Sequence, residues 1–183
     1  MTIACYICFV NEATAVICLM AMSRRADRIV RRKKEDVCFE LANRVFFRLY
    51  QASNLMHKTG SRSVSEFGST TQQWAVLGAL SRPAVREHGM TVKELIEFLL
   101  TSRQNLTAVL NRLERSNFIE RVRSAADGRI RHIRLTGQGA KTWSRMLINI
   151  RTYYKGALDG FSTEECLMLY RLLDRLKSRL TSL

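Results

Sequence analysis

The chain has 183 residues, of which 46% are hydrophobic and 25% charged, so it can form a folded core and is not wholly disordered. Thirty lysines and arginines against 16 acidic residues give a formal net charge of +14. Such a balance indicates a polyanionic partner, either nucleic acid or an acidic membrane surface. The single proline excludes proline-rich architectures and leaves long helices unbroken.

We expect residues 1–34 to be an N-terminal extension, which is apolar up to residue 22 and basic beyond it. The positive charges follow the apolar stretch, whereas a secretory signal carries them in front. Asn11 and Glu12 interrupt the stretch, which is therefore shorter than a membrane span of about 20 residues. We expect a cytoplasmic protein without a membrane partner, and a membrane-anchored regulator using residues 1–22 is an alternative.

Five cysteines are an odd number without framework spacing, which favours a reduced, cytoplasmic protein. Cys5 and Cys8 form one C-x-x-C pair, but no second pair follows, so we expect neither a metal site nor a cofactor. The chain also has only three histidines and no nucleophile, paired-carboxylate or phosphate-loop motif, which indicates that it is not an enzyme.

A long helix is predicted from Glu35, because apolar residues recur every three or four positions from Val37 to Met56. It should end before the polar segment 58–69, so that residues 35–69 form a dimerisation helix and a linker. Four capping boxes then mark helix starts, each with a hydroxyl residue and Gln or Glu three positions later. They are Thr70 with Gln73, Thr91 with Glu94, Thr101 with Gln104, and Ser162 with Glu165.

The second and third boxes begin two short amphipathic helices separated by two or three residues, which is a helix-turn-helix arrangement. The second of these helices presents side chains that match base edges, since Arg pairs with guanine, Asn or Gln with adenine, and the Thr methyl with thymine. An ordinary solvated helix face is the alternative for these residues. The predicted base-reading set is Ser102, Arg103, Gln104, Asn105, Thr107, Asn111 and Arg112.

Two short β-type segments, 118–123 and 130–136, flank Asp127-Gly128, a dipeptide typical of a hairpin turn. Residues 102–134 contain eight arginines and no lysine against three acidic residues, a net charge of +5. A hairpin after a helix-turn-helix is a wing, whose arginines can enter a minor groove. We assign residues 70–136 to a winged helix-turn-helix DNA-binding lobe, with the wing arginines Arg123, Arg129 and Arg131 in the DNA site.

Residues 137–183 read as two further helices, broken around Gly156 and Asp159-Gly160. In the last one, leucines recur at alternating spacings of four and three, and such a narrow seam requires a partner helix. We therefore predict C-terminal dimerisation helices and a homodimer that binds pseudo-palindromic operator DNA with half-sites roughly one helical turn (~10 bp) apart.

These residues resemble the MarR family of bacterial transcription factors from about Glu35 to the C-terminus. The resemblance is carried by the stretch from Ser102 to Arg115, by Asp127-Gly128-Arg129, and by the exit Leu135-Thr136-Gly137-Gln138-Gly139. Asn117 stands where the family usually has Gly, and Asn also tolerates a left-handed backbone. The resemblance implies a mainly α, winged-helix homodimer in which Asp127 orients the wing and Arg129 enters the minor groove.

The resemblance also implies a repressor that releases DNA when a small aromatic or phenolic acid binds between the dimer helices and the DNA-binding lobe. An aromatic wall and a cation for a carboxylate would come from Tyr50, His57, Trp74, Arg82, Arg86 and His88, although each has an ordinary structural explanation as well. Other members sense oxidants through a cysteine. Here Phe46 stands where the reactive cysteine of hydroperoxide sensors would be, and Cys38 would have to serve in the alternative redox mechanism.

Overall fold

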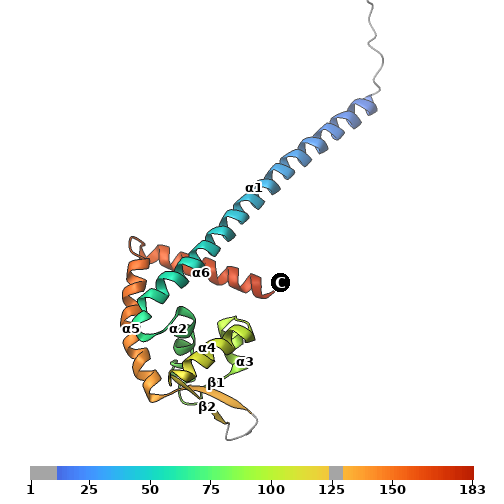
Figure 1. Ribbon diagram of the computed structural model, residues 1–183. Helices are drawn as coiled ribbons and strands as arrows, with labels where there is room; N and C mark the ends of the chain where they lie inside the picture. Colours follow the sequence, from blue (N-terminus) through green and yellow to red (C-terminus); the bar gives the residue numbers. More distant parts are fainter. Residues whose placement is uncertain (1–11, 124–129) are drawn as a thin grey trace, which may run out of the picture. The chain divides into compact units, whose positions relative to one another are not determined.

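The computed structural model describes residues 12–123 and 130–183, with side chains described from Glu35 onward and at Arg31. The chain divides into two compact units, Met1–Ser53 and Asn54–Leu183, and each is considered by itself. Helix α1 (Glu12–Ser63) begins in the first unit and ends in the second (Figure 1). In the described part of the chain, no helix combines the length and the apolar character that a membrane crossing requires.

Helix α1 is longer at both ends than the apolar stripe predicts. It already includes Glu12, well before Glu35, and the predicted end before residue 58 is wrong, because the helix runs on to Ser63. Hydroxyl side chains stabilise this last polar turn, with Thr59 donating to the Leu55 carbonyl and Ser63 to that of Gly60. The short 3₁₀ helix η1 (Ser65–Phe67) follows, and Gly68 ends it in the left-handed conformation.

Three helices form the centre of the second unit: α2 (Thr71–Leu80), α3 (Val92–Leu99) and α4 (Arg103–Arg115). The capping boxes predicted for α2 and α3 are both present, with Thr70 and Thr91 as N-caps. The box predicted at Thr101 is wrong. The N-cap of α4 is Ser102, whose hydroxyl accepts the backbone N–H of Asn105, so the helix begins one residue later.

The sheet has three antiparallel strands in the order β1-β3-β2. Strands β2 (Ile119–Arg123) and β3 (Arg131–Leu135) form the predicted hairpin, with Ile119 opposite Leu135 and Arg123 opposite Arg131. Strand β1 (Met90–Thr91) was not predicted, because two residues are too few to show an alternating pattern. It pairs with β3 and fixes the start of α3 against the wing.

One hydrophobic core joins these elements. Its fully buried side chains come from the α1–η1 junction, α2, α3, α4, the sheet and α5: Val64, Val76, Leu77, Leu80, Leu95, Leu106, Leu110, Leu113, Ile119, Ile133 and Met146. The apolar stripes that the sequence predicts for α3 and α4 therefore face this core. Their opposite faces are left to solvent.

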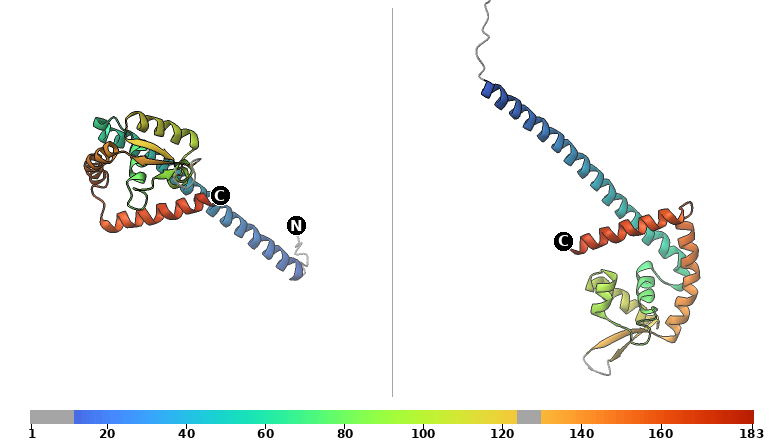
Figure 2. Two further views of the ribbon diagram at one scale, coloured as in Figure 1. Left: turned by 90° about the horizontal axis from the view of Figure 1, so that it is seen from below. Right: turned by 180° about the vertical axis from the view of Figure 1, so that it is seen from behind.

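The last two helices are α5 (Gly137–Ala157) and α6 (Thr163–Thr181), and α6 begins at the predicted capping box of Ser162 with Glu165. Figure 2 shows α5 alongside the three-helix lobe, with α6 following from the C-terminal end of α5. Helix α5 buries Met146 and Ile150, whereas α6 buries none of its side chains. The secondary structure of this region matches the prediction of two helices with a break between them.

Candidate nucleic-acid interface and adjoining cavity

Helix α4 has a buried face and a polar exposed face. Leu106, Val109, Leu110 and Leu113 lie in the core, and this fixes which side chains point outward. The predicted base-reading residues on α4 and its cap are all exposed: Ser102, Arg103, Gln104, Asn105, Thr107, Asn111 and Arg112. Two of them have their hydroxyl groups engaged. Ser102 caps the helix, and Thr107 donates to the Arg103 carbonyl at 2.7 Å.

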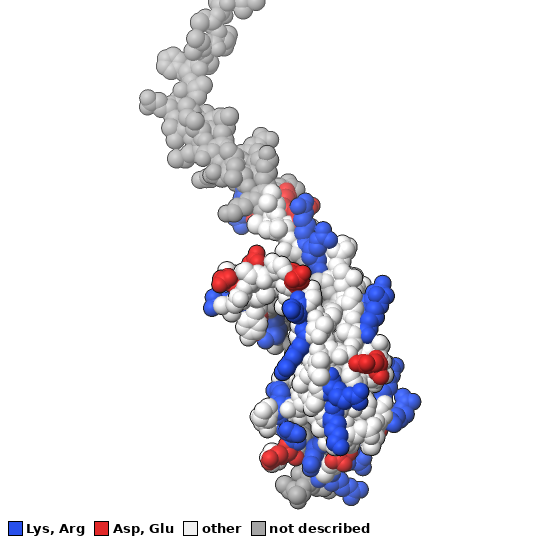
Figure 3. Space-filling model, turned by 90° about the vertical axis from the view of Figure 1, so that its left-hand side faces the viewer, with Lys and Arg blue, Asp and Glu red and all other residues white. Residues whose placement is uncertain are grey.

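The wing carries exposed arginines on both of its strands. Arg123 and Arg131 are directly opposite each other in the β2–β3 register, and both are exposed. The predicted wing residues Asp127 and Arg129 lie outside the described residues. On the face of the second unit seen in Figure 3, lysine and arginine side chains are more widespread than acidic ones. An exposed helix and a basic hairpin together form a surface suited to duplex DNA.

One interaction within this surface was not predicted. Arg121 of β2 donates from Nε to the Glu114 carboxylate at 3.0 Å and from its terminal nitrogen to Oδ1 of Asn111 at 3.0 Å. Arg121 therefore connects the wing to α4 and is paired with an acidic side chain. The sequence contains no local signal for this contact, since seven and ten residues separate the partners.

A cavity of about 390 Å³ lies beside the first turn of α4. Its wall includes two aromatic side chains, Trp74 of α2 and Tyr154 of α5, whose ring centroids are 5.7 Å apart in an edge-on arrangement. The end of α1 contributes His57, whose Nδ1 is 2.8 Å from the Thr71 hydroxyl oxygen. Desolvation at this site raises the pKa of Tyr154, so the phenol stays neutral well above physiological pH.

The helix-turn-helix itself supplies the other side of the cavity. Its wall includes the turn residues Leu100 and Thr101, the core-facing Leu106, and Asn105 of the predicted base-reading set. Leu100 has φ +50°, a left-handed conformation that leucine adopts at a cost. A molecule bound here would touch the segment that positions α4.

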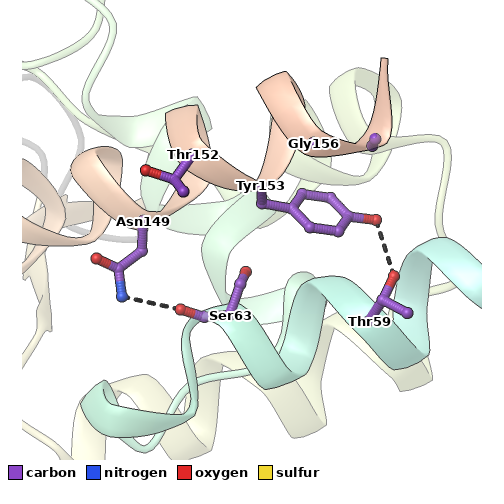
Figure 4. A pocket seen from close by; sticks show the side chains of 7 residues that line it. Thr59, Ser63, Asn149, Thr152, Tyr153 and Gly156 are labelled. Carbon is purple, nitrogen blue, oxygen red and sulfur yellow. Dashed lines mark hydrogen bonds between the residues drawn. The ribbon is translucent and has the colours of Figure 1, made fainter. Parts of the chain in front are cut away.

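A second hollow, of about 640 Å³, is a wide groove between the end of α1 and α5 (Figure 4). Its polar side chains are already bonded to one another or to the backbone. Thr59 and the Tyr153 hydroxyl are 3.1 Å apart, and Asn149 donates to the Ser63 carbonyl at 3.0 Å (Figure 4). These bonds join α1 to α5 and give the groove a structural explanation.

The six predicted effector residues do not come together. His57 and Trp74 line the 390 Å³ cavity, whereas Arg82, Arg86 and His88 are absent from its wall. Arg82 instead stacks on Phe98, with its guanidinium carbon 3.7 Å from the ring centroid, and donates to the Ala79 carbonyl. Arg86 and His88 are exposed in the loop before β1, and Tyr50 belongs to the first unit. The predicted aromatic wall is therefore present in part, without the predicted arginines.

Comparison with known proteins identifies the family. Residues 67–130 match the model described as "MarR family". The chain is 44% identical over 155 residues to the transcriptional activatory protein BadR of Rhodopseudomonas palustris, an alignment that covers 82% of this chain and 88% of that protein. The chain belongs to the MarR family. It is a transcriptional regulator and not an enzyme, as predicted.

Two further relatives bear on the function of this MarR-family chain. It is 28% identical over 112 residues to the homoprotocatechuate degradative operon repressor of Escherichia coli, covering 61% of this chain and 72% of that one. The structure of reduced AbfR bound to DNA aligns with a TM-score of 0.64 at 25% identity, covering 81% of this chain and 99% of that one. The winged helix-turn-helix predicted from the sequence is confirmed.

Hydrogen bonds and close packing account for the residues found at the junction between the wing and α5 of this MarR-family chain. Asn117 adopts φ +55°, the left-handed conformation that justifies Gly or Asn at this position. Thr136 caps α5 by accepting the N–H of Gly139, and it donates to the Asn117 carbonyl. Gly139 is buried against the backbone of Phe118, where a larger residue has no space. The short motif that resembles the family therefore forms one bonded corner.

Proposed function

We propose that this MarR-family regulator is a homodimer that binds a pseudo-palindromic operator and represses transcription until a small aromatic acid releases it. The observation that carries the proposal is the position of the cavity. It is lined by the turn of the helix-turn-helix and by Asn105 of α4, so its occupant contacts the DNA-reading unit directly. The proposal has three parts, each with its own support.

DNA reading by α4 and the wing is supported by the exposed polar face of α4 and by the paired arginines Arg123 and Arg131. Amide and guanidinium groups at the start of α4 match the hydrogen-bonding edges of the major groove. The wing arginines carry the charge that phosphates or a narrow minor groove attract. The relative bound to DNA aligns over 81% of this chain.

Dimer formation is supported by α6, which buries no side chain within a single chain. Leu169, Leu173 and Leu180 are each more than 40% exposed, on a helix whose leucine seam has no partner within the described chain. Exposed apolar side chains in this number favour association. A twofold dimer places two copies of α4 on two half-sites, which is why we expect a pseudo-palindromic operator.

An aromatic acid is supported by the chemistry of the cavity wall. Trp74 and Tyr154 offer aromatic faces and edges, and His57 with Thr71 offers polar groups for a carboxylate or phenol. A volume of about 390 Å³ suits a single substituted ring. The Escherichia coli relative is named for a degradative operon of an aromatic acid, homoprotocatechuate.

Transcriptional activation is a second candidate, since the relative with 44% identity is named an activatory protein. The sign of regulation depends on where the operator lies relative to the promoter, and both outcomes use the same DNA contacts. A reporter fused to the bound promoter separates the two. Deletion of the gene raises expression if the chain represses and lowers it if the chain activates.

Redox sensing through Cys38 is the alternative from the sequence. Cys38 is a free, exposed thiol on α1. A Cys38→Ser variant that loses an oxidant response would support this mechanism, and a variant that behaves like the parent would remove it.

The ligand-responsive mechanism is tested by filling the cavity. Ala75 of α2 lines it, and Ala75→Leu adds apolar volume where the ring of the effector is proposed to lie. We expect this variant to bind operator DNA like the parent and to lose its release by aromatic acids. The control for a general loosening of the core is Leu80→Val, which shortens a buried core side chain that does not line the cavity. A variant that still responds fully to the acid would contradict the proposed site.

A further inference from the structure

Arg121, Glu114 and Asn111 form a hydrogen-bonded chain between β2 and the exposed face of α4. The Arg121 guanidinium donates to Glu114 Oε2 and to Asn111 Oδ1, at 3.0 Å in each case. The Arg121 side chain is 28% exposed and that of Glu114 is 42% exposed, so the ion pair is partly shielded from water. Two bonds to one planar guanidinium fix its position across the helix.

This contact determines which edge of the Asn111 amide is free. A guanidinium is a donor only, so the Asn111 atom that faces it must be the carbonyl oxygen. The Nδ2 group then points away from Arg121. A freely rotating Asn reads adenine by accepting from N6 and donating to N7 at the same time. Here Oδ1 already accepts from a cation, whose charge disfavours a second donor at that oxygen.

We propose that Arg121 is a specificity-determining positioning residue. It holds Asn111 as a hydrogen-bond donor in the major groove, so that α4 selects guanine or thymine at the base facing Asn111 instead of adenine. Guanine offers O6 and N7 as acceptors and thymine offers O4, whereas adenine offers only N7 and leaves its N6 donor without the Oδ1 partner that a bidentate pair requires. This inference rests on the proposed DNA-reading role of α4, and it replaces the Asn-to-adenine pairing expected from the sequence at this position.

The ion pair also removes Arg121 from the set of phosphate-binding arginines. Glu114 neutralises its charge, whereas Arg123 is exposed on the same strand. We therefore expect the two arginines to differ in their effects on DNA binding. Loss of Arg123 weakens binding to all sequences, while loss of Arg121 changes which sequence is preferred.

The test measures dissociation constants of the full chain for its operator and for every single-base-pair change in one half-site, at fixed salt. Asn111→Ala identifies the base pair that Asn111 reads, because the preference there should fall by about 10-fold. Arg121→Met keeps the apolar stem and removes the donors. We expect it to shift the preference at that same base pair toward adenine, with less than about a threefold change elsewhere.

Three controls separate specificity from folding and from charge. Glu114→Gln retains an acceptor for Arg121 Nε and should keep the guanine or thymine preference. Arg123→Gln removes the same charge from the same strand and should weaken all sequences about equally, with a shallower salt dependence. Far-UV circular dichroism shows whether each variant is folded, and Arg121→Leu, which also removes the donors, provides a second substitution if Arg121→Met unfolds.

The outcomes are distinct. The inference is wrong if the parent chain prefers adenine at the base read by Asn111, or if Asn111→Ala alters no position. It is also wrong if Arg121→Met weakens every sequence equally, because Arg121 would then be a phosphate contact. If the folded parent chain shows no sequence-selective DNA binding, the proposed function is wrong. If the parent binds its operator but Arg121→Met leaves the base preference unchanged, only the inference about Arg121 is wrong.

Discussion

Substituting Gly139 with alanine tests the bonded corner between the wing and α5. A Cβ at this position would overlap the carbonyl oxygen of Phe118 and come within 2.7 Å of its carbonyl carbon. An ordinary carbon–carbon contact needs about 3.5 Å, so the start of α5 must move by roughly 1 Å. Such a shift strains two bonds of the corner, Thr136 N–H to the Phe118 carbonyl and the Thr136 hydroxyl to the Asn117 carbonyl.

The expected magnitude follows from these terms. Overpacking costs about 1–3 kcal/mol and each weakened hydrogen bond about 1 kcal/mol, while replacing Gly by Ala in a helix gains up to about 1 kcal/mol. We therefore expect Gly139→Ala to lower the free energy of unfolding by about 2–4 kcal/mol. For a chain of this length, that corresponds to a fall in Tm of roughly 5–15 °C.

Gly137→Ala is the matched control, because it lies in the same first turn of α5 and its Cβ would meet no atom within 4 Å. We expect this variant to be as stable as the parent or slightly more stable. Urea unfolding, followed by far-UV circular dichroism at one fixed protein concentration, measures all three chains. Equal stability of the two variants would refute the explanation given for this glycine.

Three further substitutions test other parts of the structure. The backbone N–H and hydroxyl of Thr91 hold the pKa of the Glu94 carboxyl below its ordinary value of 4.5. The ionised carboxylate therefore stabilises the fold above that pH, and this contribution is lost as the pH falls through the lowered pKa. Glu94→Gln should therefore cost about 0.5–1 kcal/mol in urea unfolding at pH 7 and progressively less as the pH falls below 4.5, and a pH-independent difference would contradict this assignment. Arg82→Ala should lower stability by about 1–2 kcal/mol, through loss of the Phe98 contact and the bond to Ala79, without changing effector affinity in a fluorescence titration; a weaker effector complex would return Arg82 to the site. Leu173→Glu on α6 should shift sedimentation from dimer to monomer, and an unchanged dimer would place the interface elsewhere.

The local architecture could be predicted from the sequence because it depends on neighbouring residues. Three of the four capping boxes cap helices, and the stripes of α3 and α4 face the core as their spacing predicts. The error at Thr101 shows the limit of such motifs. Two adjacent hydroxyl residues compete for one cap, and Ser102 takes it because its hydroxyl reaches the N–H of Asn105.

The candidate site could be predicted only in part, since its remaining features depend on contacts between distant residues. The polar turn after residue 58 is helical, and its Gly60 lies against α2, close to Thr71 and Trp74, which are distant in the sequence. The sequence does not show that Arg82 stacks on Phe98 of another helix, so Arg82 was predicted to bind a carboxylate. The pairing of Arg121 with Asn111 likewise requires the wing to be folded against α4.

The most direct test of the central claim is fluorescence anisotropy of the purified chain on its own upstream intergenic DNA, across a salt series, with and without a panel of aromatic acids. We expect tight binding that weakens steeply with salt, and release by one of the acids in the parent chain but not in Ala75→Leu. Sequence-selective binding that no acid disturbs would contradict the effector mechanism. Absence of sequence-selective binding would contradict the proposed function as a whole.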